Sequence, residues 1–272
     1  MPFINFKLKE PTEIIPWGTE PNTRIHWFGL TDGSYWLRVG DKTLYQHTDE
    51  IMHSWDISGD PYTDYYIVRF LEDFTELFYA IVEPIPEDLY LIARSHFSLY
   101  DFYGKATIWL EKLQDNENVD IDLYYDKYDK IIEWIYSRTL TAMHLNSGPH
   151  ISFFRCHDKI SIVWNRHQLD ESGLAIWTAG NGQIEMLFDD FIIEVKKWGE
   201  LFFASMELQI EKAFEREWGN TEIDRVRIKE EQNERYQDFV DKVNVLTQTQ
   251  YKSTDWSLVS SLIIEMSADA TL

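Results

Sequence analysis

Carboxylate side chains crowd one stretch of the chain, between Asp49 and Asp129. This stretch holds 19 acidic and 5 basic residues, so it carries −14 of the chain's net charge of −22. Its densest part supplies six candidate partner-binding residues: Asp115, Glu117, Asp120, Asp122, Asp126 and Asp129. Because Asp122, Asp126 and Asp129 are spaced i, i+4 and i+7, they share one face of a predicted helix.

Two main interpretations of these carboxylates are open. They could form the solvated start of a helix, where the helix dipole compensates part of their repulsion. They could instead form a negative patch that meets a basic partner and speeds the encounter with it. A calcium site is the third interpretation, but Asp120-x-Asp122 lacks the glycine and the spaced terminal glutamate of a calcium loop.

Histidine is the other residue type that could hold a metal, and the chain has eight. None lies in an H-E-x-x-H motif, and Cys156-His157 has no second cysteine pair, so a zinc centre lacks ligands at a familiar spacing. Only the convergence in space of His144, His150, His157 and His167 would supply such a centre. We therefore expect no metal and no cofactor.

Nucleophilic catalysis has no motif in this sequence. There is no G-x-S-x-G turn and no glycine-rich phosphate loop. Alternation along a strand directs the side chains of Arg155 and His157 away from that of Cys156, so we expect Cys156 to be a small buried apolar residue. The chain is accordingly not expected to be an enzyme. The alternative hypothesis is a hydrolase-like enzyme whose histidines and carboxylates come from separate parts of the chain.

Composition limits the classes of protein that fit. The chain has 272 residues, of which 44% are hydrophobic, enough for a sizeable core. Its pI of about 4.6 disfavours nucleic-acid binding through phosphate neutralisation and favours a basic partner. A single cysteine excludes an intramolecular disulfide. No run approaches the roughly 18 apolar residues of a membrane span, and the N-terminus lacks a signal-peptide pattern, so we expect a cytoplasmic protein without membrane contact.

Hydrophobic periodicity places strands and helices in alternating groups. The predicted strands cover residues 25–30, 34–39, 42–45, 151–154, 160–164, 174–178 and 183–187. The predicted helices cover residues 61–83, 97–113, 122–145, 190–218, 221–243 and 255–266. Asp32-Gly33 and Asn181-Gly182 are typical of hairpin turns.

This order favours an α+β fold of antiparallel strand groups packed with long amphipathic helices. We expect one large domain over residues 1–272, with a possible seam near Gly148-Pro149. The tryptophans on predicted strands are expected to fill the core: Trp27, Trp36, Trp164 and Trp177.

Two blocks of residues carry a family resemblance. Pro16-Trp-Gly18 followed by His26-Trp-Phe-Gly-Leu-Thr-Asp-Gly-Ser-Tyr-Trp36 resembles the opening of an uncharacterised bacterial family of unknown function. The segment from Ile151-Ser-Phe-Phe-Arg through Ile160-Ser-Ile-Val-Trp-Asn165 to Trp177-Thr-Ala is similar to the later half of that family. Such proteins resemble the immunity proteins of polymorphic toxin systems, and the family has no catalytic motif to carry over.

The leading hypothesis is therefore an immunity-type protein that binds a basic cognate toxin. Its acidic helical region would occlude the active or nucleic-acid-binding surface of the toxin, because aligned carboxylates can take the places of phosphates before lysine and arginine.

Overall fold

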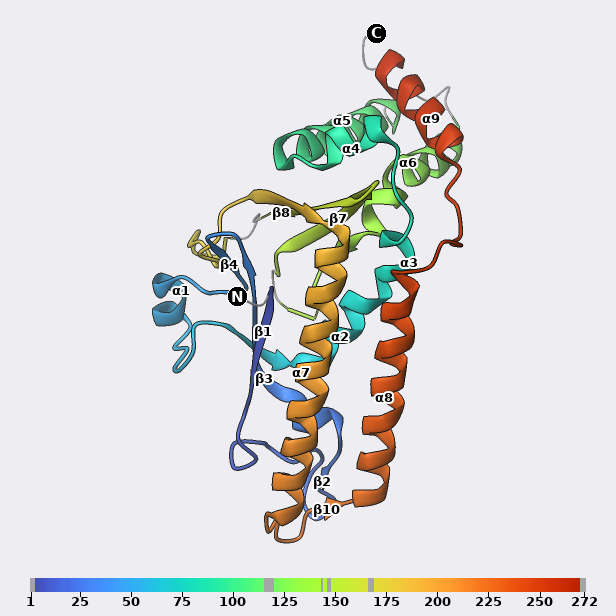
Figure 1. Cartoon of the computed structure of the whole chain (residues 1–272). Coiled ribbons are helices and arrows are strands. Elements are labelled where there is room, and N and C mark those ends of the chain that lie inside the picture. Colours follow the sequence, from blue (N-terminus) through green and yellow to red (C-terminus); the bar gives the residue numbers. More distant parts are fainter. Residues whose placement is uncertain (1–2, 115–119, 143, 146–147, 166–168, 270–272) are drawn as a thin grey trace.

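The computed structural model describes residues 3–114, 120–142, 144–145, 148–165 and 169–269. Figure 1 shows two antiparallel sheets, a pair of long helices that run away from them, and a separate group of helices near the C-terminus. The fold is α+β, as the sequence predicted. None of the helices in the described residues combines the length and apolar character that crossing a bilayer requires.

The first sheet is built around β3 (Asp32–Val39), whose buried residues alternate with half-buried ones. Strand β1 (Ile4–Leu8) pairs with one edge of β3, and β4 (Lys42–Leu44) and β5 (Thr63–Tyr66) share the other edge. A tight turn at Gly40-Asp41 joins β3 to β4, with Gly40 at a φ of 63°.

The hairpin predicted at Asp32-Gly33 is wrong. Gly33 lies inside β3, and a 3-10 helix, η1 (Phe28–Thr31), precedes that strand. A Cβ on Gly33 would stand 2.3 Å from the carbonyl oxygen of Lys7 and 2.9 Å from the Cα of Leu8. This glycine therefore permits the close approach of β1 and does not form a turn. Upstream, β2 (Arg24–Ile25) pairs in parallel with β10 (Glu222–Ile223), a contact of two distant segments.

The second sheet has the order β6 (Thr139–Leu140), β7 (His150–Cys156), β8 (Lys159–Asn165) and β9 (Gly182–Leu187). Its central strands are buried on both faces, since neighbouring residues such as Phe153 and Phe154 are each fully buried in different cores. This two-sided burial explains why the sequences of β7 and β8 are almost continuously apolar.

The strand predicted over residues 174–178, and with it the hairpin at Asn181-Gly182, is absent from the described residues. This segment forms isolated bridges only, and its backbone bonds with the segment before α1 (Asp49–Ser54): Thr178 donates to Gln46, and Thr48 donates to Ile176. Its hydrogen-bonding groups are thus satisfied outside the second sheet, which the sequence pattern does not reveal.

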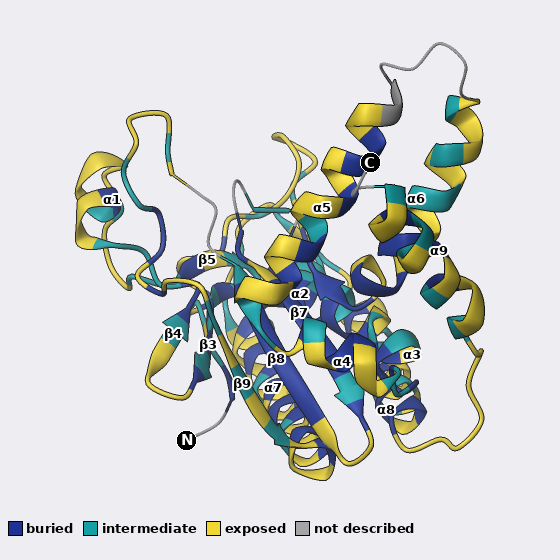
Figure 2. Ribbon diagram, turned by 90° about the horizontal axis from the view of Figure 1, so that it is seen from above, coloured by how far each residue is buried: buried dark blue, intermediate teal, exposed yellow. Residues whose placement is uncertain are grey.

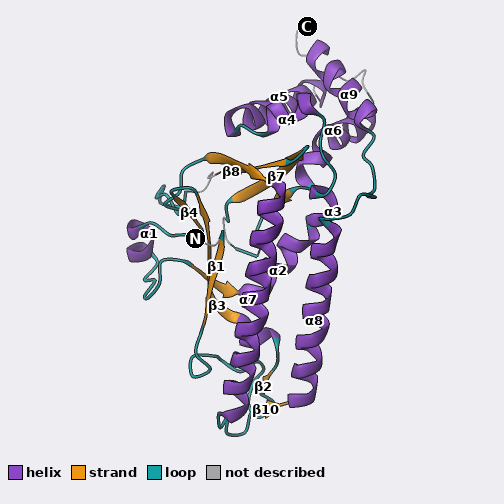
Figure 3. Cartoon of the chain, in the orientation of Figure 1, coloured by secondary structure: helices purple, strands orange, loops and turns teal. Residues whose placement is uncertain are grey.

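Helices α2 (Ile67–Glu76), α3 (Phe78–Ile81), α7 (Phe188–Glu215) and α8 (Arg225–Val245) lie on one side of the second sheet (Figures 1 and 3). The long helices α7 and α8 run side by side, and Gly199 of α7 leaves room for the ring of Phe239. The helix predicted from Pro61 begins only at Ile67, because the preceding residues pair with β3 as β5.

The opposite face of the second sheet is covered by α4 (Glu87–Ala93), α5 (His96–Gln114), α6 (Ile121–Tyr136) and α9 (Trp256–Asp269). The helix predicted to reach Leu145 ends at Tyr136, since Thr139 and Leu140 form β6 against β7. The second sheet therefore separates two apolar cores, one toward α2 and α7 and the other toward α4, α5, α6 and α9.

Three of the four strand tryptophans fill these cores as predicted. Trp27, Trp164 and Trp177 are buried. Trp36 is half-buried on the outer face of the first sheet, where its ring stacks on Tyr62 with 3.9 Å between centroids.

Candidate functional site

The exposed face of α6 carries the predicted partner-binding residues that the structure describes. Asp120 is the N-cap position, and Asp122, Asp126 and Asp129 are exposed along the helix. At about 100° per residue, these last three lie within roughly 60° of one another around the helix axis. None of the four has an ion-pair partner among the described residues. Asp115 and Glu117 lie outside the described residues.

Asp122, Asp126 and Asp129 form no ion pair with either lysine of α6 among the described residues, although Lys130 follows Asp126 by one turn on the same side of the helix. Lys127 instead bonds with Glu265 of α9 and lies 4.8 Å from the ring centroid of Tyr124. The hydrogen bond with Glu265 is the main reason that the pKa of Lys127 is raised. The three aspartates thus face solvent with their negative charge available to a partner.

Exposed apolar side chains also occur on α5 and at the end of α6. On α5, Phe97, Tyr100 and Ile108 are 75%, 53% and 54% exposed. On α6, Tyr136 is 53% exposed, and its ring packs against that of Tyr103 at 5.9 Å between centroids. We refer to Phe97, Tyr100, Ile108, Tyr136, Asp122, Asp126 and Asp129 together as the α5–α6 face. Figure 2 shows the outward sides of both helices exposed.

Sequence reasoning missed the apolar half of this face. The buried side of α5 packs in the core through Leu99, Phe102, Ala106 and Trp109. Residues Phe97, Tyr100 and Ile108 form a second row on the same helix at helical spacings, and this row was the available signal. A helix with two apolar rows has one more than packing on a single core requires.

The histidines that the structure describes do not converge as a metal site. No group of three or more potential metal ligands occurs in the described part of the chain. His150 begins β7, His157 is exposed in the turn between β7 and β8, and His167 lies outside the described residues. His144 lies elsewhere, in contact with the first sheet and α2.

His144 is the centre of a buried polar relay. Its Nδ1 lies 3.0 Å from Asp73 Oδ2, and its Nε2 lies 3.0 Å from the hydroxyl of Tyr35. Asp73 and His144 also line a cavity of about 350 Å³ beside Arg69. The Tyr35 side chain is fully buried, and burial raises the pKa of its phenol well above the usual value. The relay thus has the order carboxylate, imidazole, hydroxyl, but its hydroxyl is protonated and closed to solvent.

Cys156 ends β7 and is 5% exposed, as expected for a small buried residue. Burial raises the pKa of its thiol, with smaller contributions from Glu87 and Glu185. A thiol that stays protonated is a poor nucleophile.

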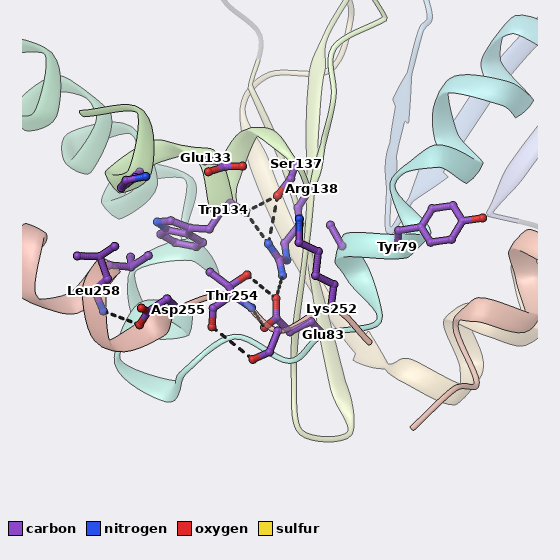
Figure 4. A pocket seen from close by; sticks show the side chains of 14 residues that line it. Tyr79, Glu83, Glu133, Trp134, Ser137, Arg138, Lys252, Thr254, Asp255 and Leu258 are labelled. Atoms are coloured by element: carbon purple, nitrogen blue, oxygen red, sulfur yellow. Dashed lines mark hydrogen bonds and ion pairs between the residues drawn. The ribbon is translucent and has the colours of Figure 1, made fainter. Parts of the chain in front are cut away.

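A buried ion pair joins three distant segments at the C-terminal end of α6 (Figure 4). Arg138 Nη2 donates to Glu83 Oε2 at 2.9 Å, and both side chains are nearly inaccessible. The Glu83 carboxylate also accepts bonds from the Thr254 backbone and hydroxyl and from Trp256 Nε1. The carboxylate is saturated by these bonds, so the pair connects the segment between α8 and α9 to the rest of the fold.

The cavity of about 400 Å³ beside this ion pair is lined by residues of both charges, including Lys130, Lys252, Glu133 and Asp255. Opposite charges in equal number give it no net preference for an anion or a cation. Glu83 and Arg138 are 55 positions apart, and no local sequence pattern links them.

Comparison with known proteins assigns the chain to a family through a sequence model only. No curated protein and no solved structure matches it. A model described as a family of unknown function, DUF5984, matches residues 3–262, which is nearly the whole chain. The expected membership of such a family is confirmed, whereas the link to immunity proteins stays a prediction. The chain belongs to the family DUF5984.

Proposed function

We propose that this protein binds a basic protein through the α5–α6 face, and that it acts in the cytoplasm as an immunity-type inhibitor of a cognate toxin. The observation that carries the proposal is that exposed carboxylates without ion-pair partners and exposed aromatic rings occur on the same helix, α6. Tyr136 follows Asp129 by two helical turns, so the two residues lie on the same side of α6.

The acidic stripe supplies attraction over a distance. Three exposed carboxylates on one helix face create a local negative potential, which raises the rate at which a basic protein arrives. A toxin that acts on nucleic acid presents lysine and arginine where phosphates bind, so the stripe would occupy the same positions. Inhibition would then follow from occlusion.

The apolar residues supply the contact itself. Interfaces typically place aromatic side chains at a desolvated centre and charged residues at a solvated rim. Phe97, Tyr100 and Tyr136 fit the first role, and Asp122 and Asp126 fit the second. The charges are thus expected to govern the association rate, and the rings are expected to govern dissociation.

Charge reversal on the stripe tests the proposal. The tagged protein is purified from its source cells at low and high salt, and the captured proteins are identified by mass spectrometry. We expect a basic protein with the natural chain and much less of it with D122K/D126K. In stopped-flow measurements with that partner, association should slow by about tenfold or more and should lose most of its salt dependence.

A matched control separates local charge from total charge. Glu207 and Glu211 are exposed on α7, have the same i, i+4 spacing, and have no ion-pair partner among the described residues. E207K/E211K changes the net charge equally and should leave capture intact. Equal loss with both double variants would show that total charge matters and would refute a site on α6.

Co-expression tests the inhibitory part. The captured partner, expressed alone, should arrest growth, and the natural chain should restore it while D122K/D126K should not. A partner that is harmless by itself would rule out the immunity-type role and leave a binding protein.

We propose hydrolysis at the Asp73–His144 pair as the alternative function. The contact between the two side chains and the adjacent cavity favour it, because a carboxylate that orients an imidazole is the arrangement of a general base. His144 would have to release the Tyr35 hydroxyl from its Nε2 to accept a proton. Its test is turnover of p-nitrophenyl esters by the natural chain and by H144Q. Turnover that disappears in H144Q would support this alternative, and equal turnover in both proteins would exclude it.

A further inference from the structure

A third cavity lies under α5, where this helix and the end of α6 meet the second sheet. Its volume is about 220 Å³. Six ring-bearing side chains from four elements line it: His96, Tyr100, Tyr103, Tyr136, His150 and Trp164. Cavities that hold drug-sized molecules are typically about 300 Å³ or larger. This one has room for a single long side chain.

The lining offers π faces and oxygen acceptors. None of the residues that line the cavity is a lysine, an arginine or a carboxylate. The Thr139 hydroxyl already bonds with Ser152 at 2.7 Å and with the Ile135 carbonyl. The side-chain oxygen of Asn165 is buried and has no hydrogen-bond donor among the described residues. A buried acceptor without a donor costs free energy unless a ligand supplies the N–H group.

A carboxylate lies outside the cavity but on the same helix. Tyr136 lies at the edge of the cavity, and Asp129 lies two helical turns before it on α6, about 10 Å along the helix axis. Asp129 contributes to the raised pKa of the Tyr136 phenol, after burial and Tyr128. A cation that approaches along α6 is therefore attracted by this carboxylate over a distance.

We infer that this cavity binds the guanidinium group of one arginine side chain. A planar guanidinium stacks on aromatic faces and carries several N–H donors, one of which can reach Asn165. The source of this arginine rests on the proposed function, since a basic partner on the α5–α6 face would present its side chains at this opening. The cavity would then receive the residue that anchors the partner.

The test uses N-acetyl-arginine amide as the probe and N-acetyl-citrulline amide as its uncharged counterpart. Binding is followed by NMR through the indole N–H of Trp164, which lines the cavity and donates to the Gly180 carbonyl at 2.7 Å. We expect a saturable shift of this signal with the arginine probe at millimolar concentration. Equal shifts with the citrulline probe, or no saturable shift, would overturn the inference.

Substitutions at the rim show whether the rings bind the probe. Tyr136 is more than half exposed, so Y136A should fold normally. This variant should bind the arginine probe with an affinity roughly threefold to tenfold lower than that of the natural chain. Y136F keeps the ring and should keep the affinity. Y125A removes a tyrosine of the same helix that does not line the cavity, and it should bind like the natural chain. Equal affinities of Y136A and Y125A would refute the site.

This experiment needs no partner, so its outcome is separate from that of the proposed function. Saturable binding of the arginine probe in a protein that captures no basic partner would support the site and refute the partner. Capture of a basic protein that depends on Asp122 and Asp126, with no binding of the probe, would support the partner and refute the arginine site.

Discussion

Replacing Gly199 with alanine tests how α7 packs on α8. A Cβ at this position would stand 2.0 Å from Cζ and 2.2 Å from Cε1 of Phe239, far inside normal contact. Phe239 is 2% exposed and lies in the larger core, so its ring has little room to retreat. Overpacking costs about 1–3 kcal/mol, and an approach of 2.0 Å places this case at the upper end, about 3 kcal/mol. Alanine regains about 1 kcal/mol of this cost in a helix interior. We expect G199A to lower the free energy of unfolding by about 2 kcal/mol.

A double-mutant cycle makes this prediction specific. F239A alone should cost about 3–5 kcal/mol, because it leaves a cavity in the core. In that background the clash is gone, so G199A should stabilise the protein by up to about 1 kcal/mol. The sign of the substitution therefore reverses, and the coupling between the two sites is about 3 kcal/mol.

Urea denaturation followed by far-ultraviolet circular dichroism measures these differences. Gly104 on α5 is the control, since a Cβ there meets nothing within 4 Å, and G104A should stabilise the protein by about 1 kcal/mol. Equal destabilisation by G199A in both backgrounds would refute the reasoning, because the cost would then not arise from the ring of Phe239.

Two further predictions concern buried polar groups. E83Q should lower the free energy of unfolding by about 3–5 kcal/mol, because it leaves Arg138 without a counter-charge. The rate of amide hydrogen exchange in α9 should also rise, since Glu83 bonds with the segment before this helix. An unchanged exchange rate in α9 would contradict this role of Glu83. Burial lowers the pKa of His47 below 6.5, so the unfolded chain binds protons first and stability should fall as the pH drops through 6.5. Unfolding curves measured across this pH range should show a smaller loss in the free energy of unfolding for H47F than for the natural chain. Some loss should remain in H47F, because burial also lowers the pKa of His26. Identical dependence of the free energy of unfolding on pH in both proteins would contradict the assignment to His47.

The sequence predicted elements whose periodicity is strong and local. The apolar spacing of α5, α7 and α8 follows the helical repeat, and the structure places helices there. Strands β7, β8 and β9 also lie where their apolar and β-branched residues predicted them. The aspartates of α6 could be placed on one exposed face for the same reason, since their spacing alone determines it.

Tertiary structure decided the elements whose hydrogen bonds are made far along the chain. Thr63 to Tyr66 fit the start of a helix, but β3 offers them partners, and they form β5. Gly33 resembles a turn residue, but the approach of β1 gives it another role. A local pattern contains no information about which distant backbone will arrive, so it cannot choose between these outcomes.

The candidate sites divide in the same way. The charge of the α6 stripe could be predicted from residue types along one helix. Three other sites combine residues from distant segments. They are the cavity under α5, the relay of Asp73, His144 and Tyr35, and the pair of Glu83 and Arg138. Their chemistry depends on distances of about 3 Å between such residues, and only the packing of the sheets and helices determines those distances.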